Sequence, residues 1–246
     1  MPNPESVAYS GSRACADYVN DQTVQLTLFV TALELAMEND GLPDAAAAQI
    51  DGNPDPHVSF RSWFDRQMAE TLLTRAVDGF LTYLADVLAM VYEANPNALP
   101  TEANIPVSLA LELDDRDALV RELAGRRVRR LSRKGIDALN RPFRALGFPL
   151  YRSEGERKSI ERAIARRDLI VHSRGIVDRA YLRRVPGSNK AALGAPLPLR
   201  SSWAVDDSLM LVETAVRVDQ AVVERWGFET VEIRVGSSEE AVHVEE

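Results

Sequence analysis

A long stretch without proline, from Ser59 to Ala94, constrains the fold more than any other feature of this sequence. Its apolar residues recur three or four positions apart, which is the spacing of one face of an α-helix. They are Trp63, Met68, Leu72, Ala76, Phe80, Leu84 and Leu88. Ser59 can cap this helix, because a serine side chain accepts hydrogen bonds from the first free amides. Gly79, in the middle of the stretch, indicates either a bend or a site of close packing.

The same spacing predicts further helices, separated by loops rich in Gly, Pro, Asp and Asn. They cover residues 18–39, 116–133, 134–146, 154–174, 178–184 and 206–226, after a polar lead-in over 1–16. Residues 107–113 alternate as in a short strand, and the C-terminal TVEIRVGSSEEAVHVEE indicates a weak hairpin or an acidic tail. We therefore predict an all-α bundle of five or more helices with long loops and at most a small C-terminal hairpin. Residues 1–235 would form one domain, and residues 236–246 an acidic tail or hairpin edge.

Composition excludes several classes of protein. With 46% hydrophobic and 27% charged residues, the chain is not a disordered polymer, a collagen-like repeat or a small disulfide scaffold. Its single cysteine, Cys15, cannot form an internal disulfide, and no Cys/His pairs have zinc spacing. We see neither a secretory signal nor an apolar run long enough to span a membrane, so we expect a cytoplasmic protein without a membrane partner.

Charge is distributed unevenly along the chain. The whole chain has a formal net charge of −8, yet residues 121–184 contain 19 Lys or Arg and 7 Asp or Glu. The densest part of this basic segment consists of Arg126, Arg127, Arg129, Arg130, Arg133 and Lys134. A basic segment in an acidic protein is typical of a polyanion-binding site, but it is equally typical of a solvated face that pairs with acidic helices.

One of the three histidines stands in a distinctive environment. His57 lies in a loop and His243 in the expected tail, whereas His172 lies near the end of an Arg-rich helix, in RRDLIVHSRG. Asp168 and His172 are four residues apart and share a helix face, so the carboxylate can orient the imidazole. A histidine can move a proton near neutral pH, and the guanidinium of Arg167 can hold the charge that develops when a phosphodiester is cleaved.

The string RRDLIVHSRGIVDRAYL, residues 166–182, resembles the signature segment of the HEPN superfamily, and RRLSRKGIDALNRPFRALGFPL resembles the preceding helix. The family motif is an Arg followed by a polar residue, then a His after four to six intervening residues. Arg167, Asp168 and His172 fit this pattern. The position two residues after the His is Arg174 rather than the Tyr of nucleotidyltransferase-regulated toxins, and the next Tyr is Tyr181. This departure argues against that form of regulation.

The resemblance implies an HEPN-like bundle with its signature over residues 125–185, acting as a metal-independent endoribonuclease without a cofactor. Two copies would form one composite site, and RNA would be left with 2′,3′-cyclic phosphate ends. The expected settings are antiviral defence or a toxin–antitoxin system, with an antitoxin or regulatory protein as a further partner.

Chemistry and resemblance together assign a role to each candidate residue. His172 would be the general acid or base, Arg167 would stabilise the transition state, and Asp168 would orient the His or the substrate. We expect Arg167 and His172 to be exposed. Flanking phosphates would be held by Arg166, Arg174, Arg126, Arg127, Arg129 and Arg130. Two alternatives are a helical dimer that binds RNA or protein without cleaving it, and an interaction domain whose basic segment pairs internally.

Overall fold

The computed structural model describes residues 7–38, 60–99, 115–185 and 193–235. The expected strand over 107–113, His57, His243 and the segment 236–246 lie outside these ranges. Within them the chain is mostly helical, with seven α-helices, one short 3₁₀ helix, η1 (Pro96–Ala98), and one two-stranded sheet. The predicted all-α class is therefore confirmed for the described part of the chain. None of the described helices is long and apolar enough to cross a membrane.

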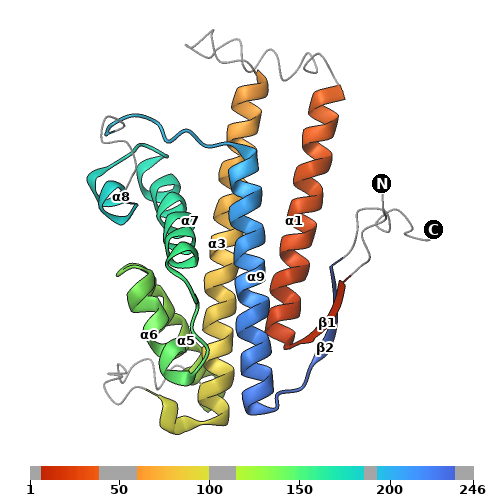
Figure 1. Cartoon of the computed structure of the whole chain (residues 1–246), viewed down its shortest axis with the longest axis vertical. Coiled ribbons are helices and arrows are strands. Elements are labelled where there is room, and N and C mark those ends of the chain that lie inside the picture. Colours follow the sequence, from red (N-terminus) through yellow and green to blue (C-terminus); the bar gives the residue numbers. More distant parts are fainter. Residues whose placement is uncertain (1–6, 39–59, 100–114, 186–192, 236–246) are drawn as a thin grey trace, which may run out of the picture.

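Three long helices lie side by side and form the centre of the molecule (Figure 1). They are α1 (Arg13–Glu38), α3 (Phe60–Ala94) and α9 (Ser201–Trp226). Four shorter helices pack beside them on the side away from α1: α5 (Arg116–Ser132), α6 (Ile136–Leu146), α7 (Glu154–Ser173) and α8 (Arg179–Arg184). Helix α3 contacts α1, α5, α7 and α9, so it connects the two groups of helices.

The starts of the helices follow the sequence signals where a cap is local. Asp115, Ser153 and Asp178 cap α5, α7 and α8, and each side chain accepts a hydrogen bond from an amide three residues later. Two helices begin earlier than expected. Helix α1 begins at Arg13, because Ser12 Oγ accepts a hydrogen bond from the Cys15 amide, and α9 begins at Ser201.

The first and last described segments of the chain pair with each other, a pairing that the sequence did not predict. Strand β1 (Val7–Gly11) runs antiparallel to β2 (Val231–Val235), with Val7 opposite Val235. The polar lead-in is thus partly a strand and the first turn of α1. Ser12 fixes this arrangement, because its amide donates to Asp219 Oδ2 of α9 at 2.7 Å and its hydroxyl donates to Oδ1. The buried hydrogen bonds between Ser12 and Asp219 hold the end of β1 against α9. The chain that leaves α9 therefore pairs with β1 as strand β2.

Gly79 is a site of close packing. An added Cβ would lie 3.0 Å from Cε2 of Tyr18 and 3.3 Å from Nε2 of Gln22, both on α1. The Tyr18 ring is buried and stacks on Tyr83 with 5.8 Å between centroids, and its hydroxyl donates to the carbonyl of Ala76 at 3.4 Å. The missing side chain therefore allows α1 to approach α3.

Replacing Gly79 with alanine should lower the free energy of unfolding by about 1–2 kcal/mol, because the Tyr18 ring has no room to move. The opposite sign is usual, since alanine in a helix interior is favoured over glycine by about 0.5–1 kcal/mol. Gly125→Ala in α5 is the matched control: its Cβ would meet the flexible end of Arg129, so the usual gain should appear. Urea unfolding of both variants measures the difference, and an equal gain at the two positions would contradict the packing argument.

Candidate functional site

A groove of about 860 Å³ lies between α3, α5 and α7, and the Arg/His motif lines it. Helix α7 contributes Arg167, Asp168 and His172. Helix α3 contributes Asp78 and Asp86 among others, and α5 contributes a stripe of side chains. That stripe consists of Ala118, Arg121, Glu122, Gly125, Val128, Arg129, Ser132 and Arg133. We call this site the α3–α5–α7 groove. It joins the motif and part of the basic segment on one surface.

Arg167 is held inside the groove by two carboxylates. Its Nη2 lies 2.5 Å from Oδ1 of Asp78 on α3, and its Nη1 lies 3.1 Å from Oδ1 of Asp168. Its side chain is 22% exposed, so the expectation of a freely exposed arginine is wrong. The helix turn places Arg167 towards α3, where Asp78 neutralises it. His172, by contrast, is exposed near the end of α7.

Asp168 is paired differently from our expectation. Its Oδ2 accepts a hydrogen bond from Nη1 of Arg184 at 2.6 Å, and its Oδ1 accepts from Arg167. Among the described residues, the structure records no hydrogen bond between Asp168 and His172. Burial alone would lower the pKa of Arg184, but its bonds to Asp168 and Glu161 together raise it, so this arginine stays charged. A permanent cation in reach competes better for the carboxylate than a neutral imidazole does.

Of the six arginines expected to hold phosphates, Arg129 lines the groove and the other five do not. Arg126 pairs with Glu122 on its own helix at 2.6 Å, and Arg127 lies over the ring of Tyr92 at 6.0 Å. Arg130 and Arg174 are exposed. The structure thus separates the basic segment into a groove-facing stripe and side chains that point elsewhere.

Arg166 has structural partners. Its Nη1 lies 2.6 Å from Oδ2 of Asp207 on α9, and its guanidinium lies over Trp203 at 4.9 Å. The side chain is 11% exposed, and Asp207 is buried. Burial raises the pKa of Asp207, and Arg166 partly offsets this rise. Trp203, which has the pattern of a core residue, is partly exposed and also carries Arg200 over its ring.

Sequence reasoning gave no role to five charged groove residues that the structure places near the motif: Asp78, Asp86, Arg121, Glu122 and Arg133. A signal existed for the arginines, since Arg121, Gly125, Arg129 and Arg133 are spaced by four residues and share one helix face. The positions of Asp78 and Asp86 depend on how α3 packs against α5 and α7. No spacing in the sequence could reveal that packing.

Charges cancel inside the groove, whereas the basic segment around it keeps an excess of positive charge. Four arginines and four carboxylates line the groove, so its formal net charge is zero with His172 neutral. Around it, the surplus remains: of the 19 Lys and Arg residues between Arg121 and Arg184, eight form ion pairs. Three of these eight pair with acids on α3 or α9, which is the internal pairing that one alternative predicts. The other eleven have no ion pair among the described residues.

Replacing Arg166 with alanine should lower the free energy of unfolding by about 3–5 kcal/mol at neutral pH, because Asp207 would remain buried without its main partner. Arg130→Ala, an exposed neighbour in the same basic segment, should change it by less than about 0.5 kcal/mol.

The Arg166→Ala loss should depend on pH. Without Arg166, the pKa of Asp207 in the folded state lies further above its value in the unfolded chain. As the pH falls, the folded state therefore takes up the proton before the unfolded chain does. The loss should therefore grow as the pH rises through the raised pKa and shrink in acid. Chemical unfolding across this range measures it, and a loss independent of pH would contradict the role of the buried carboxylate.

The chemistry of this groove has to be judged from its own residues. No protein-family model, curated protein or solved structure matches this chain. Among the described residues, no group of three or more His, Cys, Asp or Glu side chains is arranged to hold a metal ion. The features that remain are one exposed imidazole, one clamped guanidinium and a row of arginines, in the α3–α5–α7 groove.

Proposed function

We propose that this protein binds RNA at the α3–α5–α7 groove and cleaves it as an endoribonuclease of the HEPN type. The observation that carries the proposal is that Arg167, Asp168 and His172 line one groove with Arg121, Arg129 and Arg133. These are the groups that RNA cleavage without a metal requires: a proton carrier, a cation at the phosphate and further cations along the backbone.

His172 would take the proton from the 2′-hydroxyl or give one to the leaving 5′-oxygen. Its exposure near the end of α7 leaves it open to a substrate and to a second copy of the chain. In the proposed homodimer, two copies of the motif face one another and form one composite site. Arg167 would stabilise the charge on the phosphorane, with its Nη2 released from Asp78 when the phosphate enters. The proposed setting is antiviral defence or a toxin–antitoxin system in the cytoplasm, with an antitoxin or regulatory protein as partner.

Wild-type protein should cleave single-stranded RNA in EDTA and leave 2′,3′-cyclic phosphate ends, whereas His172→Ala should not. His172 is exposed, so its loss should leave the fold intact, and circular dichroism serves as the check. Arg167→Lys keeps the charge but loses the planar fork, and it should lower the cleavage rate by about tenfold or more. Arg75→Ala, at an exposed position of α3 that does not line the groove, is the matched basic control and should cleave normally. Cleavage by His172→Ala at the wild-type rate would rule out the assignment.

A second candidate is an RNA- or protein-binding module without nuclease activity. The observation in its favour is that Asp78 and Asp168 already neutralise Arg167 and that the groove has no net charge. In this case the motif pairs would serve to fix α7 on α3, and the exposed cations on α5–α8 would do the binding.

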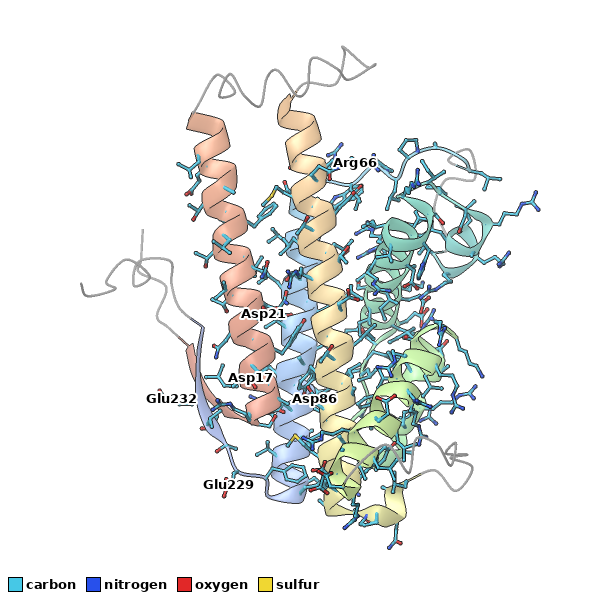
Figure 2. The ribbon with its side chains drawn as sticks, turned by 180° about the vertical axis from the view of Figure 1, so that it is seen from behind. Asp17, Asp21, Arg66, Asp86, Glu229 and Glu232 are labelled. Carbon is cyan, nitrogen blue, oxygen red and sulfur yellow. The ribbon has the colours of Figure 1, made fainter. Side chains whose placement is uncertain are left out.

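Asp78→Asn distinguishes these two functions. If Arg167 contacts phosphate, removal of the competing carboxylate should strengthen RNA binding about two- to fivefold, because a partly exposed ion pair contributes up to about 1 kcal/mol. Asp21→Asn on α1, labelled in Figure 2, makes the same change of charge on an exposed residue that does not line the groove. Fluorescence anisotropy with labelled RNA measures both. An equal effect of the two variants would favour the module in which Arg167 is structural.

A further inference from the structure

A second cavity, of about 360 Å³, lies between the start of α6, the first half of α7 and the end of α8. Six Lys or Arg side chains line it: Lys134, Arg157, Lys158, Arg162, Arg183 and Arg184. The acids in its wall are Asp137 and Glu161. We call this site the α6–α7–α8 cavity. Unlike the α3–α5–α7 groove, it has a clear excess of positive charge.

Both oxygens of Glu161 are engaged by the protein itself. Oε2 accepts from the amide of Ile136 at 2.6 Å, and Oε1 accepts from Nε of Arg184. The carboxylate is buried, so it holds the first turn of α6 and one wall residue in place. It is not available to a cationic ligand. The chemistry left for a ligand is therefore that of the cations.

The cations differ in how firmly they are paired. Arg157 is held by two hydrogen bonds of 2.7 Å to Glu154 and lies 3.5 Å from Asp137. Lys158 has a single exposed pair with Glu154, and such a pair contributes little in water. Lys134 and Arg183 are exposed and have no ion pair among the described residues. Nη2 of Arg184 is buried without a hydrogen-bond partner in the described part of the chain. Several donors are thus open to an anion with more than one acceptor oxygen, such as a phosphate group.

The cavity and the α3–α5–α7 groove have neighbouring wall residues. Arg133 lines the groove, and the next residue, Lys134, lines the cavity. Arg184 forms the boundary, because it bonds Glu161 in the cavity wall and Asp168 in the groove wall. Glu161 and Asp168 are seven residues apart on α7 and so lie on one face, about 10 Å apart along the helix. A phosphate chain leaving the motif therefore meets a second set of cations next to the first.

We propose that the α6–α7–α8 cavity is a second phosphate-binding subsite, which holds phosphodiesters of the RNA strand that passes through the α3–α5–α7 groove. This inference rests on the proposed binding of RNA but not on its cleavage. It assigns flanking phosphates to Lys134 and Arg183, with Arg157, Lys158 and Arg162 around them. Arg166, Arg126 and Arg127 have other partners.

The test uses the full chain and a labelled single-stranded oligonucleotide with 2′-O-methyl groups, which the enzyme cannot cleave. Binding is measured by fluorescence anisotropy at several salt concentrations, for wild type and for the double variant Lys134→Gln/Arg183→Gln. Each phosphate contact on a single strand contributes about 0.7 to the slope of log K against log salt. The double variant should therefore have a slope shallower by about 1.4 and bind about tenfold more weakly at low salt.

The matched control is Arg75→Gln/Arg152→Gln. Both arginines are exposed, have no ion pair among the described residues and line neither the groove nor the cavity. This variant loses the same charge but removes no proposed phosphate contact, so it should keep the wild-type slope. Equal slopes for the two double variants would overturn the subsite. All four residues are exposed, and thermal unfolding confirms that each protein is folded.

A second probe separates the two sources of phosphate. ADP carries phosphate groups without a polynucleotide chain, and the proposal expects it to compete weakly with the oligonucleotide. If the cavity variant loses ADP binding but binds the oligonucleotide like wild type, the cavity holds a free phosphorylated ligand and the RNA path is wrong. If wild type does not bind the oligonucleotide at all, the proposed function fails as well, which distinguishes that outcome from failure of the subsite alone.

Discussion

The packing of four other helices against α3 is the constraint on which the rest of this structure depends. Phe80, Tyr83, Leu84, Leu88 and Tyr92 are almost completely inaccessible, and each large side chain removed from water contributes about 1.5–3 kcal/mol. Four helices contact α3, so its buried residues are covered by several partners at once. Helices α1 and α9 cover one part, and α5 and α7 cover another. The α3–α5–α7 groove is the place where the cover by α5 and α7 is incomplete.

This arrangement also separates the charges. Figure 2 shows Asp17 and Asp21 on α1, on the side of the molecule away from α5–α8. The basic segment folds into α5–α8 as one layer, and α3 lies between this layer and α1. A few arginines of this layer form ion pairs with acids of the long helices, as Arg166 does with Asp207 and Arg167 with Asp78. These pairs attach the layer to the bundle, while most of its cations remain in solvent.

Sequence reasoning succeeded where the signal is local and failed where a distant element decides. The all-α class and the long helix ending at Ala94 follow from the spacing of apolar residues. The pairing of β1 with β2 joins segments that are far apart in the sequence, so no local pattern predicted it. Arg166 and Arg167 are neighbours in the sequence, yet one packs against α9 and the other against α3. These partners depend on how α7 packs against α3 and α9, which the local sequence does not show.

The paired charges of the groove and the unpaired cations around it would contribute differently to the binding of a polyanion. A polyanion gains little long-range attraction from a groove whose arginines and carboxylates cancel, because the potential outside a balanced set of charges falls off quickly. Attraction has to come from the unpaired cations of α5–α8, whereas the groove supplies direction through fixed donors. The pairs of Arg167 with Asp78 and of Arg184 with Asp168 keep those donors in place while no ligand is present. In the proposed function, a phosphate that replaced one carboxylate would meet a guanidinium already oriented, and the loss of one ion pair would be offset by the formation of another.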